Sequence, residues 1–484
     1  MPYIRSITFI FFIAALIFPI IGDTYPLDFV LYVILFSLFI WLLALLNDFL
    51  SSLIALILSA FFTQRMLILY LDPTVFSYQW VTNEEITLSV LFCLFAVIGI
   101  YFGSLTFSLA SNKPQNIESN KNDKYLNSQT FRTLVGNIDI NSFIRVSSYL
   151  VLIGLSINIY FVITSGIGVA SITADRGDVG INLSFIEKLF TRIGPFFTYL
   201  MMFILTVFVK KDSFSKRTIL LAYFTTFIYI LYDLVIVTSK GTFIWLAFTL
   251  LIINQLVKGH VSKVIVRRAA YVVIVSVVFL FALIGILRPV ISDYFASGGI
   301  NVDRLLYGVE ITFFDTISQF SNRLSAFDWL AGIMAYQGDL FSYSGTFGPQ
   351  ISAMINSYFP GELIQEPDYM EISHAMPIYL DNQPLNTTTR ELPGGLSIMF
   401  LSFGWGSCFV YYLMTLLLRF MQASNLHIFY KLIIYTNFTL SHFTGGLGTF
   451  IYLTDRILAI IICVLIVKIL IYFVRDFNRY LIVR

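Results

Sequence analysis

The chain has 484 residues, of which 58% are hydrophobic and 12% are charged, and its mean hydropathy is +0.83. Soluble domains carry roughly 25% charged residues, so this composition excludes a soluble globular protein and indicates a membrane protein with many spans. The net charge of +2 is too small to indicate a nucleic-acid-binding protein. Cys93, Cys408 and Cys463 each lie inside an apolar run, which predicts packing residues rather than a disulfide or metal framework.

Twelve apolar segments are long enough, or nearly long enough, to cross a bilayer, which takes about 20 residues. They are 7–22, 27–47, 50–71, 86–110, 145–165, 193–209, 218–238, 242–257, 269–288, 396–418, 432–453 and 456–474. The first follows a single arginine, Arg5, and lacks a small-residue cleavage site, so we expect a retained span rather than a signal peptide. The sequence therefore predicts an all-α polytopic membrane protein of about 12 transmembrane helices.

The distribution of Lys and Arg predicts the orientation of these spans. With the N-terminus in the cytoplasm, the inside segments hold 19 of these residues and the outside segments hold 9. Cytoplasmic segments carry the excess of Lys and Arg in membrane proteins. We therefore expect both termini on the cytoplasmic side.

Two polar loops divide the predicted spans. Residues 1–288 hold the first nine spans and a polar, basic loop at 111–144, which we expect to be a flexible cytoplasmic connector. Residues 289–395 form an outward-facing loop of 107 residues, and residues 396–484 hold the last three spans and a basic cytoplasmic end. Apolar residues between 303 and 337 recur at helical spacing, which predicts amphipathic helices on the outer face of the bundle. An ordered loop of this length is usually functional.

Cations gather on the predicted outer side, where they are disfavoured. Arg176, in "ITADRGDVG" (172–180), follows the fifth span, and Arg65 lies near the outer end of the third. The others are Arg192, Lys240, Arg288, Arg304, Arg323 and Arg390. A polyanionic ligand would explain them, because guanidinium groups bind phosphate oxygens in a bidentate way. Local ion pairs are the alternative, since the large loop alone has twelve acidic residues against three arginines.

A few other side chains are candidates for acid–base chemistry. His374, in the large loop, and His442, near the outer half of its span, can act as general bases, although a lone histidine is more often a hydrogen-bonding residue. Asp233 is an acid inside a predicted span. Glu84-Glu85, in the second outer loop, keeps open a polyprenyl-phosphate-sugar glycosyltransferase that uses an adjacent acidic pair. No nucleotide-binding or zinc-protease motif is present, so we expect no cofactor and no metal.

Three segments in and after the large loop resemble a bacterial family. They are "FSNRLSAFDWL" (320–330), "YSGTFGPQISAMINSYFP" (343–360) and "TTTRELPGGLSIMFLSFGWGS" (387–407). Their order is similar to that in the Wzy-type O-antigen polymerases, which join oligosaccharide repeat units. The matching positions are Arg323, Phe327, Asp328, Gly345, Thr346, Pro360, Pro393, Gly394, Gly404 and Gly406.

The resemblance implies a GT-C-like glycosyltransferase at the outer face of the bacterial cytoplasmic (inner) membrane. Its substrates would be undecaprenyl-diphosphate-linked oligosaccharides, its product O-antigen, capsule or exopolysaccharide, and a polysaccharide chain-length regulator would be a partner. Arginines would stabilise the departing diphosphate without a metal. The implied catalytic residues are Arg176, Arg288, Arg323, Arg390 and His374, and the implied substrate-binding residues are Arg192, Lys240, Asp328, His442 and Tyr343.

The sequence departs from the family at two positions and leaves other functions open. Gly361 stands where family members often carry an arginine, and Lys240 keeps the charge but loses the fork of the Arg-Gly pair in related ligases. O-antigen ligase shares the chemistry and is one alternative. A lipid-linked oligosaccharide flippase is another, although the long outer loop argues against it. A receptor that uses the Arg-Gly-Asp tripeptide at 176–178 is the third, but tripeptides recur by accident.

Overall fold

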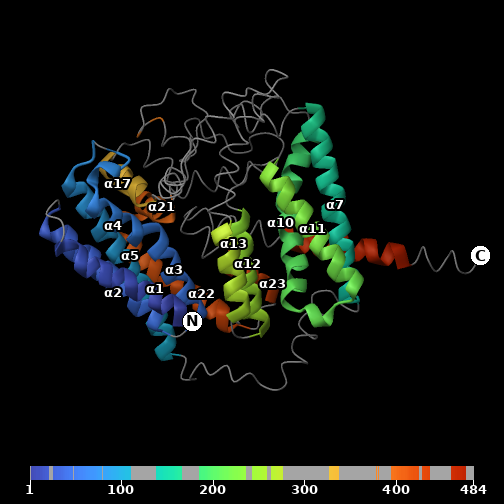
Figure 1. The fold of residues 1–484 in the computed structure, drawn as a ribbon, viewed down its shortest axis with the longest axis horizontal. Helices are drawn as coiled ribbons and strands as arrows, with labels where there is room; N and C mark the ends of the chain where they lie inside the picture. The colour runs from blue at the N-terminus through green and yellow to red at the C-terminus, as the bar shows by residue number, and fades with distance from the viewer. Residues whose placement is uncertain are drawn as a thin grey trace, which may run out of the picture. The chain divides into compact units, whose positions relative to one another are not determined.

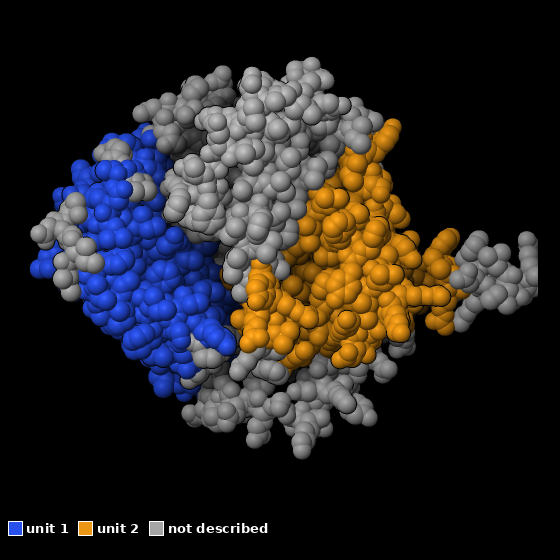
Figure 2. Space-filling view, in the orientation of Figure 1, with its two compact units in different colours: residues 1–116, 319–426, 433–454 blue, residues 117–318, 427–432, 455–484 orange. Residues whose placement is uncertain are grey.

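A computed structural model of the chain describes residues 2–20, 25–46, 48–78, 80–110, 138–165, 185–235, 242–258, 263–275, 326–336, 378, 380, 394–424, 428–436 and 459–475. Every regular element within these ranges is a helix, as the sequence predicts. The described helices belong to two compact units (Figures 1 and 2).

Five helices in the described ranges are long and apolar enough to cross a membrane. They are Leu27–Leu45, Phe49–Leu71, Asn83–Ala110, Ile140–Tyr160 and Leu396–Met421, and each coincides with a span that the sequence predicts. Shorter apolar helices at Tyr3–Ile17, Phe196–Val209 and Trp245–Lys258 fall on three more predicted spans. Within the described ranges, the prediction of an all-helical protein with helices long and apolar enough to cross a membrane is therefore confirmed, whereas the count of about 12 spans stays a prediction.

Unit 1 combines the N-terminal helices with segments that follow more than 200 residues later. It comprises Met1–Asn116, Gln319–Leu426 and Ile433–Thr454 (blue in Figure 2). Its helices are α1 (Pro2–Ile17), η1 (Phe18–Ile20), α2 (Leu27–Leu45), α3 (Phe49–Leu58), η2 (Ser59–Thr63), α4 (Gln64–Leu71), η3 (Pro73–Val75), α5 (Asn83–Ala110), α17 (Ala326–Tyr336), α21 (Gly394–Phe403), η6 (Gly404–Gly406) and α22 (Ser407–Ala423). The unit therefore joins part of the large loop to both flanking sets of spans, whereas the predicted three-part division follows chain order and stays a prediction.

Two glycines bring α5 and α22 into backbone contact. A Cβ atom added to Gly99 would lie 2.3 Å from the carbonyl oxygen of Cys408, and one added to Gly103 would lie 2.7 Å from that of Tyr412. Small residues four apart allow this close approach of helices in membranes, where there is little hydrophobic force between helices. Gly99 and Gly103 thus bring the backbones of this helix pair together.

Large apolar side chains of the same two helices remain exposed. On α5 they are Leu88, Phe95, Phe102 and Leu109, which recur every seven residues, and on α22 they are Phe409, Leu413, Leu417 and Phe420. A stripe of this length is unfavourable in water, whereas lipid tails would cover it. The stripe supports the membrane assignment from the structure itself.

Unit 2 comprises Ile117–Ser318, His427–Leu432 and Asp455–Arg484. Its helices are α7 (Ile140–Ser165), α10 (Phe185–Val209), η4 (Lys211–Ser213), α11 (Lys216–Val235), α12 (Thr242–Lys258), α13 (Lys263–Val275) and a helix over 459–475, while α23 (Ile428–Thr436) is divided between the units. Helix α7 packs on α10 and α11, and α12 packs on α10 and α13. The side-chain oxygen of Asn141 accepts a hydrogen bond from the Ser215 N–H at 2.9 Å, which ties the start of α7 to the α10–α11 turn.

Candidate functional site

Helix α17 is the described helix of the large loop, and it is buried in unit 1. Of its 11 residues, AFDWLAGIMAY, eight are buried, and it packs on α5, α21 and η2. The sequence led us to expect amphipathic helices on the outer face of the bundle. Helix α17 differs because its side chains are apolar on nearly every side, which favours burial over a surface position. The rest of the predicted amphipathic region, 303–325, lies outside the described residues.

A bidentate ion pair joins α17 to the third span. Arg65 Nε donates to Asp328 Oδ1 at 2.9 Å, and Arg65 Nη2 donates to Asp328 Oδ2 at 2.6 Å. The two residues are 263 positions apart in the chain, and their side chains are 2% and 0% exposed. A planar guanidinium fork fits a carboxylate in one orientation, so the pair fixes the geometry of α17 on α4 as well as its contact.

Ser77 completes the coordination of this carboxylate. Its backbone N–H and its hydroxyl donate to Asp328 Oδ2 at 3.0 Å and 2.8 Å. Asp328 therefore accepts four hydrogen bonds, which offset the cost of burying its charge. We call Arg65, Ser77 and Asp328 the Asp328 cluster. Because its carboxylate is buried and already carries four donors, the geometry favours a positioning role for Asp328 over direct contact with a substrate.

Aromatic residues lie beside the Asp328 cluster. Tyr25 is buried and stacks on Phe29, with ring centroids 4.3 Å apart. Burial raises the pKa of Tyr25 to about 12, with the Asp328 carboxylate adding to the rise and Arg65 opposing it. The Tyr25 phenol therefore stays protonated at neutral pH and does not compete with Asp328 for the arginine as a second anion.

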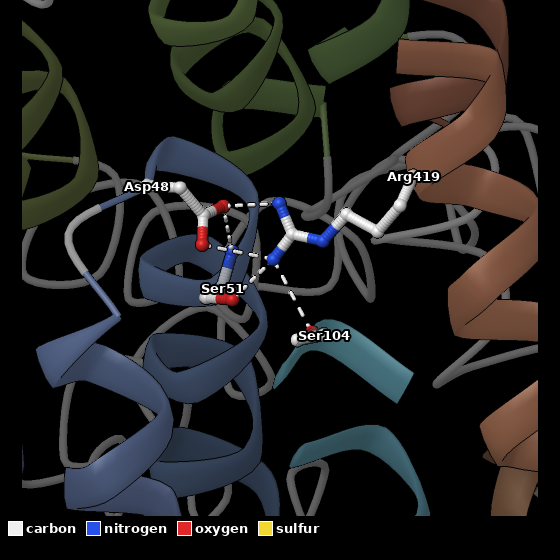
Figure 3. A network of polar contacts seen from close by, with 4 residues as sticks. All are labelled: Asp48, Ser51, Ser104 and Arg419. Atoms are coloured by element: carbon white, nitrogen blue, oxygen red, sulfur yellow. Dashed lines mark hydrogen bonds and ion pairs between the residues drawn. The ribbon is translucent and has the colours of Figure 1, made fainter. Parts of the chain in front are cut away.

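A second buried ion pair lies at the other end of the third span (Figure 3). Arg419 of α22 donates from Nη1 to Asp48 Oδ1 at 2.5 Å and from Nη2 to Asp48 Oδ2 at 2.8 Å. Its Nη2 also donates to the hydroxyls of Ser51 and Ser104, the latter at 3.2 Å. Asp48 caps α3 by accepting from the Ser51 N–H at 2.9 Å. We call these four residues the Asp48 cluster, and it joins α3, α5 and α22.

The two clusters hold the third span at both ends. Asp48 and Arg65 are 17 residues apart, and at 1.5 Å per residue this corresponds to about 26 Å along a helix. The hydrocarbon core of a bilayer is about 30 Å thick. The separation of the two clusters is therefore close to the thickness of the apolar layer. Each ion pair thus lies towards one edge of that layer, away from its centre, where a charge is most costly.

Most of the predicted site residues lie outside the described residues, namely Arg176, Lys240, Arg288, Arg323, Tyr343, His374, Arg390 and His442. Arg192 lies on α10, and Asp233 lies half-buried on α11, both in unit 2. Of the set, the structure describes the surroundings of Asp328 in detail. The predictions for the other residues stay predictions.

Helices α17 and α21 pack on each other (Figure 1). In the sequence, Arg323 comes three residues before α17 and Arg390 comes four residues before α21, and both arginines lie outside the described residues.

The acidic pair Glu84-Glu85 lies at the start of α5. The Thr82 N–H and hydroxyl donate to Glu85 Oε2 at 2.7 Å and 2.9 Å, and the Glu85 N–H donates to the Thr82 hydroxyl at 3.3 Å. This reciprocal arrangement is a capping box, which stabilises a helix start. It gives Glu85 a structural role and weakens the alternative in which the acidic pair is catalytic.

The Asp48 cluster was missed by reasoning from the sequence. Arg419 is one of the 19 Lys and Arg residues in the predicted inside segments, and no further role was predicted for it or for Asp48. The available signal was a charge at the edge of an apolar segment, because such charges are usually paired. That signal does not say which of 28 acidic residues is the partner.

Comparisons of the chain with protein families, with curated proteins and with solved structures find no match. Among the residues that the structure describes, no three His, Cys, Asp or Glu side chains are grouped to hold a metal ion.

Proposed function

We propose that the protein is a Wzy-type polymerase, which joins undecaprenyl-diphosphate-linked oligosaccharide repeat units at the outer face of the bacterial cytoplasmic membrane. The proposal includes a GT-C-like bundle of about 12 spans with both termini in the cytoplasm. The five candidate spans support the helical bundle. The excess of Lys and Arg in the predicted inside segments supports the orientation.

One observation carries the proposal: two motif segments that are far apart in the sequence pack together in unit 1. The first segment, 320–330, supplies the start of α17, and the third, 387–407, supplies α21 and η6. Helices α17 and α21 are in contact. Gly404, one of the matching positions, has φ +53°, a conformation that strongly favours glycine. Phe327, Asp328 and Gly404, three of the matching positions, thus lie on elements of one unit, which supports the proposal.

The proposed reaction makes one glycosidic bond. A sugar hydroxyl of one lipid-linked repeat attacks the anomeric carbon of the growing chain, and the bond from that carbon to the diphosphate oxygen breaks. The hydroxyl proton passes to a base, for which His374 is the candidate, and the electron pair leaves with the undecaprenyl diphosphate. Arg323 and Arg390 stabilise the negative charge that develops on this leaving group, with Arg176 and Arg288 as further donors.

Deletion of the gene tests the proposal. We expect cells with single-repeat surface glycan in place of a long-chain ladder, because export continues while polymerisation stops. A normal ladder would contradict the proposal. Repeats that accumulate on the cytoplasmic side would indicate a flippase instead. Polymer that stays on its lipid carrier and never reaches its final acceptor would indicate a ligase.

Single substitutions test the proposed arginines. We expect Arg323→Ala and Arg176→Ala to abolish chain growth at normal abundance in the membrane, because each removes a phosphate-binding fork. The control is Arg217→Ala, since Arg217 is an exposed arginine at the start of α11 on the predicted cytoplasmic side. Unchanged chain length in Arg323→Ala and Arg176→Ala would assign both arginines to a structural role.

A further inference from the structure

The turn between α10 and α11, in unit 2, joins a group of lysines to an exposed apolar face of α11. We propose that this turn and the face beside it bind one anionic phospholipid of the cytoplasmic leaflet. The choice of leaflet rests on the orientation in the proposed function, whereas the class of lipid rests on the residues of unit 2 alone.

The turn carries an excess of positive charge. Between positions 210 and 216 it has three lysines and one acidic residue, namely Lys210, Lys211, Lys216 and Asp212. Lys211 and Lys216 are exposed, and Lys210 is half-buried. Among the residues that the structure describes, no ion pair involves any of the three lysines. Their charges are therefore available to an anion from outside the chain.

The backbone of the turn is ordered by hydrogen bonds. The Ser213 N–H donates to the Lys210 carbonyl at 2.9 Å within the short helix η4. The Ser215 N–H donates to the side-chain oxygen of Asn141 at 2.9 Å, which ties the turn to α7. The lysines thus extend from an ordered backbone, which lowers the entropic cost of gathering them around one headgroup.

Helix stability does not account for Lys216. It is the first residue of α11, and the first turn of this helix holds no acidic residue. A cation is unfavourable at a helix start, because the helix dipole makes that end positive. Lys216 therefore weakens the helix, whereas an anion held beside it would offset the repulsion.

An exposed apolar face of α11 begins one turn after Lys216. Leu220, Tyr223 and Phe227 are 73%, 42% and 61% exposed. At about 100° per residue, all three lie within about 40° of Lys216 around the helix axis. Tyr223 also contacts Phe208, with ring centroids 4.6 Å apart, so this face borders α10. From Lys216 to Phe227 the helix rises about 17 Å, close to the apolar depth of one leaflet, about 15 Å.

The charge and the apolar face together define the ligand. A phospholipid has its phosphate at the membrane surface and its acyl chains below, in the same order as the lysines and the apolar face. Lysine ammonium groups bind phosphate as point charges, and their long stems let them stay at the interface. A zwitterionic lipid brings no net charge to offset the lysines, and a soluble phosphate would leave Leu220 and Phe227 uncovered. An anionic phospholipid satisfies both parts of the surface.

A lipid titration tests the inference. The purified protein in neutral detergent is titrated with phosphatidylglycerol or phosphatidylcholine, and bound lipid is measured by native mass spectrometry. We expect tighter binding of phosphatidylglycerol. Lys216→Gln should weaken it about fivefold, and Lys211→Gln with Lys216→Gln about twentyfold, because each lysine near an anionic headgroup adds its own attraction. Lys216→Arg keeps the charge and should bind as the wild type does.

Arg217→Gln is the matched control. Arg217 is exposed, carries the same charge as Lys216 and follows it in the sequence. It lies about 120° around the helix from Tyr223, away from the face that borders α10. We expect Arg217→Gln to change the affinity for phosphatidylglycerol by less than about twofold, because an exposed charge outside the site is screened by salt. Equal losses in Arg217→Gln and Lys216→Gln would show diffuse attraction and overturn the inference.

Two further results would overturn it. One is equal affinity for phosphatidylglycerol and phosphatidylcholine. The other is binding of glycerol phosphate as tight as that of phosphatidylglycerol, which would make this a site for a soluble anion. Thermal unfolding without added lipid checks that each variant is folded. A protein that binds phosphatidylglycerol through these lysines but extends no lipid-linked repeat would support the inference and contradict the proposed function.

Thiol labelling of Ser213→Cys tests the leaflet. Ser213 is exposed in the turn, and the wild type, with its three cysteines, gives the background. We expect a membrane-impermeant maleimide to label this variant in inside-out vesicles and not in intact spheroplasts. Labelling in spheroplasts would place the turn at the outer surface and overturn the assignment to the cytoplasmic leaflet.

Discussion

The Asp48 cluster yields the sharpest stability prediction, because a single buried arginine, Arg419, donates four hydrogen bonds in it. Arg419→Met removes the two bonds to Asp48 and the bonds to Ser51 and Ser104, while the Asp48 carboxylate, 8% exposed, keeps the Ser51 N–H as a donor. Removing one partner of a buried pair costs about 3–5 kcal/mol. Since Asp48 keeps that N–H, we expect a cost at the lower end, about 3 kcal/mol, for Arg419→Met.

The assay is a double-substitution cycle read by thermal unfolding of the purified protein. Arg419→Met and Asp48→Asn should each lower Tm, because each leaves a buried charge without its partner. The double variant carries neither charge, so its Tm should lie closer to that of the wild type than either single variant's. Arg217→Met, at an exposed arginine, is the control for loss of one positive charge. An unchanged Tm in Arg419→Met, or additive losses in the double variant, would refute the reasoning.

Three further substitutions test the local structure, each by the change in unfolding free energy or Tm. Gly99→Ala should cost about 1–3 kcal/mol, because its Cβ would lie 2.3 Å from a backbone oxygen of α22; a neutral result would mean that the two helices are not in backbone contact. Gly404→Ala should cost about 1–2 kcal/mol for its positive φ, whereas Gly406→Ala, with φ −65°, should stay within about 0.5 kcal/mol; equal effects would contradict the assigned conformations. Asp139→Ala should cost about 1 kcal/mol at neutral pH through loss of the α7 cap. Burial raises the pKa of Asp139, but the hydrogen bonds from Ser142 lower it by a larger amount, so the pKa is below its ordinary value of 3.8. The cap therefore stabilises above pH 3.8 and its contribution is lost as the pH falls through the folded-state pKa; a pH-independent difference between variant and wild type would contradict this.

The spans of unit 1 were the most predictable part of the chain. The segment 50–71 was expected as a span from hydropathy alone, and the structure has a continuous helix at Phe49–Leu71 with a π-helical turn at η2. Hydropathy succeeds here because a bilayer requires both an apolar surface and internal pairing of every backbone group, which only a helix of this length satisfies in an all-α chain. It carries no information about the π turn, which depends on local packing.

The position of α17 was not predictable from its sequence. The segment 326–336 is apolar with one acidic residue, a pattern that fits a surface helix, an interfacial helix or a buried one. What decides between them is Arg65, which lies 263 residues earlier and offers the fork that makes burial of Asp328 possible. The sequence shows both charges but not their pairing.

The candidate site was predictable only in its chemistry. Arg65 was recognised as an outward cation that needed a reason, and Asp328 as a motif residue with an implied substrate-binding role, and the structure pairs them. The predicted substrate-binding role for Asp328 depended on motif position, whereas its actual surroundings depend on Ser77, a residue that no pattern singles out. Long-range hydrogen bonds of this kind arise from tertiary packing and leave no local periodicity.

In vitro polymerisation of a defined undecaprenyl-diphosphate-linked repeat by the purified protein tests the central claim most directly. We expect a ladder of products that grows by one repeat at a time without added nucleotide or metal, and we expect none from Arg323→Ala. Folded wild-type protein that leaves the lipid-linked repeat unchanged would contradict the proposed polymerase function.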